Sequence, residues 1–126
     1  ALGVFPPAAC ALLPSRVGTA RATRAILTGH SLPASAWEHT GLLEAVVPDG
    51  TIATEVDRWF EAHLSRMSAA ALRHATAAAR MALRGHVRAV LPELERLYLG
   101  ELMGTEDAAE GVAAFLEKRA PRWTDR

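Results

Sequence analysis

The side chains best suited to bind a ligand stand near the end of the chain, where Phe115 and Lys118 are three positions apart in a segment with helical spacing. Residues three apart are neighbours on a helix surface, so the ring and the ammonium group could together meet a ligand that is both aromatic and anionic. Lys118 is the only lysine among 14 basic residues. A basic residue at the end of a helix is nevertheless common for electrostatic reasons alone. The residues by themselves therefore favour a structural helix docked on a core, with ligand binding as the alternative.

The segment from Thr105 to Trp123 predicts one short helix with well-marked ends. Thr105 is expected to act as the N-cap, because its hydroxyl can accept a backbone N–H of the first turn. Pro121 is expected to stop the helix. Charges suited to the helix dipole are expected in the first turn, Glu106 and Asp107, and in the last turn, Lys118 and Arg119. Apolar residues at helical spacing predict the face that packs on the core, made of Ala108, Val112, Phe115 and Leu116.

The other reactive side chains form no catalytic or metal-binding motif. The histidines are scattered along the chain, at His30, His39, His63, His74 and His86. His63 falls on an apolar helical stripe, which is typical of a core or edge histidine with satisfied hydrogen bonds. Acidic pairs such as Glu106 with Glu110 are expected to be solvated helix faces, and Cys10 to be a small buried thiol. The residues therefore predict no catalytic residue and no metal site in this chain.

Composition limits the class of protein and its partners. The chain has 126 residues, the size of a single domain, and 50% of them are hydrophobic but only 6% aromatic. Alanine supplies much of the apolar count and favours helix over strand. Fourteen basic residues balance 14 acidic ones, which argues against a nucleic-acid or membrane-surface partner attracted by bulk charge. A single cysteine and the lack of an apolar run of membrane-spanning length predict a cytoplasmic, reducing location without a membrane partner.

Short elements separated by proline and glycine are predicted for residues 1–50. Leu2–Phe5 is typical of the end of a strand or of a loop within a core, so we expect the chain to continue a longer one. A helical run at 8–13 is expected to end or bend at Pro14. Further short helices are predicted at 20–27, capped by Thr19 and closed by Gly29, and at 34–40. The apolar run 42–47, bounded by Gly41 and by a Pro-Asp-Gly turn, predicts the one strand.

Long helices are predicted for residues 51–126, which we expect to form a second region. The first carries an apolar stripe made of Ile52, Val56, Trp59, Phe60, His63, Leu64 and Met67. Ser68 is expected to cap the next helix, and Arg84-Gly85 to break it. A third helix is expected to end at Gly104, with Pro92 marking either its start or a bend.

Four segments in order resemble the C-terminal half of a crotonase, a member of the enoyl-CoA hydratase/isomerase superfamily. They are LGVFPPAACALLPSRVG, ILTGHSL, GLLEAVVP and FLEKRAPRW. Each segment is modest alone, but four in the family's order and spacing are specific, and together they span almost the whole chain. Within the superfamily, FPPAA and LYLGELMGTEDAAEG look most like the cyclohexa-1,5-dienecarbonyl-CoA hydratase group.

The resemblance implies a mainly helical chain that is the C-terminal half of an α/β spiral fold, with one strand of the spiral sheet and terminal helices that form trimers. It places the oxyanion-hole amides and the catalytic glutamates in the other half, upstream of Ala1, and therefore no catalytic residue here. It assigns one wall of the acyl pocket to Val4, Phe5, Pro6, Pro7 and Ala8. It also assigns contacts with the adenine and phosphate region of CoA to Phe115 and Lys118.

Three functions follow as alternatives from this resemblance. The first is hydration or isomerisation of an enoyl- or dienoyl-CoA through a thioester enolate, by a homotrimer or dimer of trimers, with the CoA thioester as substrate and no further cofactor. The second is a catalytically inactive, truncated crotonase-like protein that only assembles or binds. The third is a biosynthetic crotonase that dehydrates or decarboxylates its substrate; the Phe115 and Lys118 pair favours CoA over a carrier-protein arm.

Overall fold

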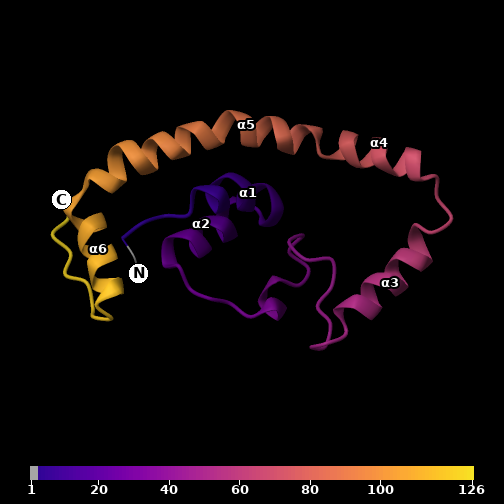
Figure 1. Ribbon diagram of the computed structural model, residues 1–126, viewed down its shortest axis with the longest axis horizontal. Helices are drawn as coiled ribbons and strands as arrows, with labels where there is room; N and C mark the ends of the chain where they lie inside the picture. The colour runs from indigo at the N-terminus through magenta and orange to yellow at the C-terminus, as the bar shows by residue number, and fades with distance from the viewer. Residues whose placement is uncertain (1–2) are drawn as a thin grey trace. The chain divides into compact units, whose positions relative to one another are not determined.

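The computed structural model describes residues 3–126, so Leu2 of the predicted opening segment lies outside the described residues. Within that range the secondary structure is helical, which confirms the mainly α prediction (Figure 1). The α-helices are α1 (Pro7–Val17), α2 (Thr19–Thr28), α3 (Ile52–His63), α4 (Ala69–Ala79), α5 (Met81–Arg96) and α6 (Glu106–Leu116). Shorter turns of helix are η1 (Ala34–Trp37), the π-helical η2 (Leu97–Glu101) and the 3-10 helix η3 (Leu102–Gly104).

The chain divides into two compact units. One contains the described residues up to Ser31 together with Gly85–Arg126, and the other is Leu32–Arg84. The first unit therefore joins the beginning of the described chain to its last helix, and this unit carries the residues singled out for ligand binding. The predicted division between residues 1–50 and 51–126 stays a prediction.

Helices α1 and α2 pack together as a pair through small residues. Ala11 of α1 is 1% exposed and Ala22 of α2 is fully buried, so the two backbones approach closely. Pro7 lies in the first turn of α1, as predicted, where its missing N–H costs no hydrogen bond. Of the two outcomes predicted at Pro14, an end or a bend, the end was wrong: α1 continues to Val17, and the carbonyl of Pro14 still accepts the N–H of Gly18 at 3.1 Å. A bend at Pro14 stays a prediction.

The caps of α2 fall only partly where the sequence placed them. Gly29 has the predicted left-handed conformation, with φ of 60°. Thr19 is not the N-cap, because Gly18 with φ of 79° occupies that position and Thr19 is the first helical residue. Gly18 thus both ends α1 and begins α2, a role that needs a positive φ.

The predicted strand at 42–47 does not form: no strand occurs among residues 3–126. A strand is defined by hydrogen bonds to a second strand, and no other segment of the described chain supplies one. The predicted helix at 34–40 is shorter than expected, because only Ala34–Trp37 is helical and turns follow.

The stripe of α3 forms as a helix but stays uncovered. Trp59 and Phe60 are 43% and 49% exposed, and α3 has no buried residue. His63 is an exposed edge residue rather than a core one. Its ring stacks on Trp59 with centroids 4.9 Å apart, and its Nδ1 lies 2.8 Å from the Trp59 carbonyl oxygen.

The start of the helix after α3 was predicted correctly, but its end was not. The Ser68 hydroxyl accepts the N–H of Ala71, so Ser68 caps α4 as expected. The break between α4 and α5 falls at Arg80 instead of Arg84-Gly85, and Gly85 lies inside α5. A helical glycine costs only about 1 kcal/mol, too little to end a helix against its neighbours. Pro92 also lies inside α5.

A π-helical turn follows α5 and brings Tyr98 against the opening segment. The Tyr98 ring meets the Phe5 ring edge-on, with centroids 5.4 Å apart and planes at 87°. This geometry is the one aromatic quadrupoles prefer. The contact joins Phe5 to the helical region that precedes α6.

Helix α6 buries a face of small residues, which shares Ala108 with the predicted face but not its larger side chains. Ala108 is fully buried, Gly111 is buried and Ala114 is 2% exposed. Phe115 and Leu116, which were expected to pack inward, are 66% and 73% exposed. Small residues allow close backbone approach, so this helix docks by its Ala and Gly side and presents its larger side chains outward.

No helix in the described range, residues 3–126, is both long and apolar enough for a bilayer crossing.

The N-cap of α6 gives a direct stability test. The Thr105 hydroxyl accepts the N–H of Ala108 at 3.1 Å and donates to the Leu102 carbonyl at 2.7 Å. Thr105→Ala is expected to lower the free energy of unfolding by about 1 kcal/mol, measured by urea denaturation. Thr105→Ser keeps the hydroxyl and is expected to lose much less. Equal losses in the two variants would contradict this role of the cap.

Candidate functional site

The end of α6 is a tight left-handed turn centred on Lys118. The Lys118 N–H donates to the Phe115 carbonyl at 3.2 Å, and the Arg119 N–H donates to the Ala114 carbonyl at 3.0 Å. Lys118 itself has φ of 55°. These two bonds and the positive φ define a Schellman-type helix end, in which the left-handed position is usually glycine. The prediction that Lys118 and Arg119 lie in the last helical turn was wrong, because α6 ends at Leu116 and both residues follow it.

A residue with a Cβ at the left-handed position carries a conformational cost of about 1–2 kcal/mol relative to glycine. Lys118 accepts that cost although glycine would avoid it. Residues held in sparsely populated backbone regions tend to gather where a side chain has a function. The turn also fixes the Lys118 backbone relative to Phe115, since a hydrogen bond joins the two residues directly.

Glu110 and Arg119 form a two-point ion pair across this turn, which we call the Glu110–Arg119 clamp. Arg119 Nη1 and Nη2 donate to Glu110 Oε1 and Oε2 at 2.6 and 2.9 Å. Arg119 Nε also donates to Glu117, and the Arg122 N–H donates to Glu110 Oε1 at 2.8 Å. The Glu110 side chain is only 23% exposed. The Arg119 guanidinium group therefore contacts both Glu117, which precedes Lys118, and Glu110 in α6.

The clamp changes the ionisation of Glu110. The hydrogen bonds from Arg119 and then from the Arg122 N–H favour the carboxylate, and they lower the pKa of Glu110 to about 2. The hydrogen bonds of Arg119 to Glu110 and then to Glu117 raise the pKa of Arg119. The expectation that Glu106 and Glu110 are merely solvated was wrong for Glu110.

The two proposed ligand-binding side chains are accessible. Phe115 is 66% exposed and Lys118 is exposed. Within residues 3–126 neither Lys118 nor Phe115 takes part in an ion pair or an aromatic pair. An aromatic face and an ammonium group lie at one end of α6, which is the arrangement expected for a ligand carrying a flat ring and a phosphate.

The residues after the turn fold back along α6 and close over its first turn. The Asp107 carboxylate accepts the Thr124 N–H at 2.7 Å and the Asp125 N–H at 2.9 Å, and the Asp107 N–H donates to the Arg126 carbonyl at 3.0 Å. These bonds, led by the one from the Thr124 N–H, lower the pKa of Asp107. The tail 119–126 is therefore tied to α6 at two places, to Asp107 in its first turn and to Glu110 in its middle.

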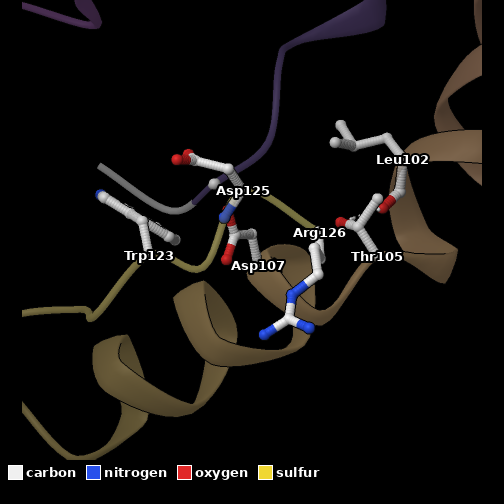
Figure 2. A pocket seen from close by; sticks show the side chains of 7 residues that line it. Leu102, Thr105, Asp107, Trp123, Asp125 and Arg126 are labelled. Atoms are coloured by element: carbon white, nitrogen blue, oxygen red, sulfur yellow. Dashed lines mark hydrogen bonds between the residues drawn. The ribbon is translucent and has the colours of Figure 1, made fainter.

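Gly3 completes this arrangement through close contact. It has φ of 66°, and a Cβ there would lie 2.9 Å from the Asp107 carbonyl oxygen and 3.0 Å from the Trp123 ring. Figure 2 shows Trp123, Asp125 and Arg126 of the tail gathered around the start of α6, with Asp107 beside them. A hollow of about 300 Å³ lies here, lined also by Leu102 and Thr105. Neither Phe115 nor Lys118 lines it, so the hollow lies at the start of α6 and these two residues lie at the other end.

The predicted acyl-pocket residues form the approach to α1. Pro7 and Ala8 begin the helix, Pro6 precedes it as the N-cap residue, and Val4 and Phe5 are half-buried. Phe5 is held by Tyr98. The hollow at the start of α6 is lined by Gly3 but by none of these five residues. Their place along an acyl group stays a prediction.

The remaining reactive groups show no gathering into a site. Cys10 is half-buried rather than buried, and desolvation raises the pKa of its thiol, which disfavours the nucleophilic thiolate. In the part of the chain that the structure describes, no three His, Cys, Asp or Glu side chains come together in a group able to hold a metal ion.

Comparison with known proteins identifies the family to which this chain belongs. The model of the enoyl-CoA hydratase/isomerase family matches residues 1–126, and the chain belongs to that family.

Among its relatives, cyclohexa-1,5-dienecarbonyl-CoA hydratase of Thauera aromatica is 43% identical over 125 residues, 99% of this chain and 48% of that protein. The 2,3-dehydroadipyl-CoA hydratase of Escherichia coli is 32% identical over 126 residues, 99% of this chain and 49% of that protein. The chain thus spans about half the length of the curated relatives it matches.

Solved structures agree with this assignment. An enoyl-CoA hydratase from Mycobacterium avium subsp. paratuberculosis superposes with a TM-score of 0.82 at 30% identity, covering 98% of this chain and 50% of that one. A carnitinyl-CoA hydratase from Mycobacterium avium gives a TM-score of 0.82 at 28% identity, covering 98% and 48%. The predicted fold, about half of a crotonase, is confirmed.

The clamp predicts a specific pH dependence of stability. The pKa of Glu110 is lower in the folded chain than its ordinary value. The contribution of the Glu110 carboxylate to the free energy of unfolding is therefore complete above about pH 5 and is lost as the pH falls toward 2. Glu110→Gln is expected to be less stable at pH 7 and to converge with the wild type near pH 2, measured as denaturation midpoints. Glu95→Gln, an exposed α5 carboxylate outside the clamp, should track the wild type; a Glu110→Gln profile parallel to both would contradict the ion pair.

Proposed function

We propose that this chain is the C-terminal part of an enoyl-CoA hydratase that acts on an enoyl- or dienoyl-CoA thioester. The observation that carries the proposal is the family match over the full chain, joined to an accessible aromatic and ammonium pair at the end of α6. The 43% identity to a hydratase of a cyclic dienoyl-CoA favours a dienoyl substrate within this class. The substrate is the CoA thioester, and the proposal includes no further cofactor.

Phe115 and Lys118 are proposed to hold the adenine and phosphate region of CoA. The Phe115 ring offers a face for stacking with the adenine, and the Lys118 ammonium offers charge to a phosphate. Their exposure and their fixed relation through the left-handed turn support this role. The positive charge also helps to explain why a lysine occupies a position that suits glycine.

Catalysis is proposed to come from residues outside these 126. In the proposed mechanism two backbone N–H groups hold the thioester oxygen while carboxylates move protons and water, and these groups belong to the remaining half of the fold. The half-length coverage of the relatives supports this division. Val4, Phe5, Pro6, Pro7 and Ala8 would contribute one wall around the acyl group.

Assembly into a trimer or a dimer of trimers, in the cytoplasm, is part of the same proposal. The described helices leave large apolar side chains uncovered, among them Trp59 and Phe60 of α3. Further polypeptide, from the rest of the enzyme or from a second subunit, would remove that apolar surface from water.

A replacement experiment tests the proposed division of labour. The 126-residue chain alone is expected to hydrate neither crotonyl-CoA nor cyclohexa-1,5-dienecarbonyl-CoA. Hydration is measured as the loss of the enoyl absorbance. Placed into the Thauera aromatica hydratase in exchange for its matching segment, the chain is expected to support hydration of the dienoyl-CoA. Turnover by the chain alone would overturn the placement of the catalytic groups outside these 126 residues. A folded but inactive replacement would overturn the proposed hydratase function and favour an inactive assembly or binding protein.

The CoA contact is tested by removing one charge. In the full-length protein, Lys118→Ala is expected to raise the Michaelis constant for the CoA ester about tenfold, equivalent to roughly 1.4 kcal/mol, and to leave kcat within twofold. Lys118→Arg keeps a positive charge and should lose less. An unchanged Michaelis constant in Lys118→Ala would remove Lys118 from the CoA site.

A further inference from the structure

The turn that carries Lys118 is unfavourable for its own sequence. Its φ of 55° belongs to the region that favours glycine, and no glycine occurs between Phe115 and Arg126. The two backbone bonds of the turn, from Lys118 to Phe115 and from Arg119 to Ala114, form only when Lys118 takes this conformation. Something besides local preference must therefore keep Lys118 in place.

The Glu110–Arg119 clamp supplies that constraint. The guanidinium fork of Arg119 engages both oxygens of Glu110, at 2.6 and 2.9 Å, and its Nε engages Glu117. Glu110 lies in the body of α6, so the clamp anchors the turn to a regular helix. A two-point Arg–carboxylate pair also fixes orientation, which a single charge contact does not.

We propose that Glu110 is a positioning residue for CoA binding: acting through Arg119, it holds the left-handed turn in which the Lys118 backbone is hydrogen-bonded to that of Phe115. The proposal rests on the proposed function, because it concerns the same CoA contact. Glu110 touches no ligand in this role; it selects one conformation of a surface turn before CoA arrives. Pre-organisation of this kind raises affinity by reducing the ordering that binding would otherwise require.

The test compares CoA with pantetheine, which lacks the adenine and the nucleotide phosphates. Dissociation constants of both are measured by calorimetry for the full-length protein at pH 7. The dissociation constant of pantetheine divided by that of CoA reports how much the Phe115 and Lys118 end contributes to CoA binding. Lys118→Ala is expected to reduce the ratio about tenfold. Glu110→Gln is expected to reduce it about three- to tenfold while the pantetheine constant stays within twofold.

Coupling separates positioning from general stability. The double variant Glu110→Gln with Lys118→Ala is expected to bind CoA no more weakly than Lys118→Ala alone, because the clamp acts only through Lys118. Arg119→Lys keeps the charge but loses the fork, and it should resemble Glu110→Gln; it also serves if Glu110→Gln fails to fold. Glu95→Gln is the matched control and should leave both constants unchanged.

The outcomes distinguish the two proposals. A wild-type ratio in Lys118→Ala would overturn the CoA contact and the positioning role together. A reduced ratio in Lys118→Ala with a wild-type ratio in Glu110→Gln and Arg119→Lys would overturn the positioning role alone. Additive losses in the double variant would show that Glu110 acts on the fold in general, and would likewise overturn it.

Discussion

The ion pair between Glu110 and Arg119 is the constraint on which the end of this chain depends. It spans the C-terminal end of α6, where no glycine occurs between Phe115 and Arg126, and Lys118 takes the left-handed conformation that lysine disfavours. The pair is only partly shielded from water, with side chains 23% and 39% exposed, so its value lies in geometry more than in net energy. The tail that follows is then fixed by Arg122 and by the Asp107 carboxylate.

The described core consists of small residues, which explains how the helices are arranged within the first unit. Ala11 and Ala22 join α1 to α2, and Ala108 and Ala114 dock α6. Alanine allows close approach but removes little apolar surface from water, about one methyl group each. The larger apolar side chains face outward instead, among them Phe115 and Leu116 of α6.

Sequence patterns predicted the helices and several of their ends, because caps are local. Thr105, Ser68 and Gly29 each act through atoms within a few residues, so their types and positions were sufficient. The strand at 42–47 was not predictable in the same way, since a strand depends on a partner elsewhere. The inward face of α6 was predicted only in part: Ala108 is buried as expected, but apolar size suggested Phe115 and Leu116 where packing selected Gly111 and Ala114. The clamp left no clear signal: Glu110 and Arg119 are nine positions apart, and only a left-handed turn at a non-glycine residue brings them together.

The close approach at Gly3 has a consequence for how the chain tolerates change. Gly3 lies so near the Asp107 carbonyl oxygen that a Cβ would be 2.9 Å from it, and Arg126 accepts the Asp107 N–H, so the chain between Gly3 and Arg126 forms a loop closed at one residue, Asp107. The entropy of closing such a loop grows only with the logarithm of its length. Added residues in the irregular segment between η1 and α3 would therefore weaken the closure very little. A single residue added between Pro121 and Thr124 would shift the tail relative to Asp107 and break the closure itself.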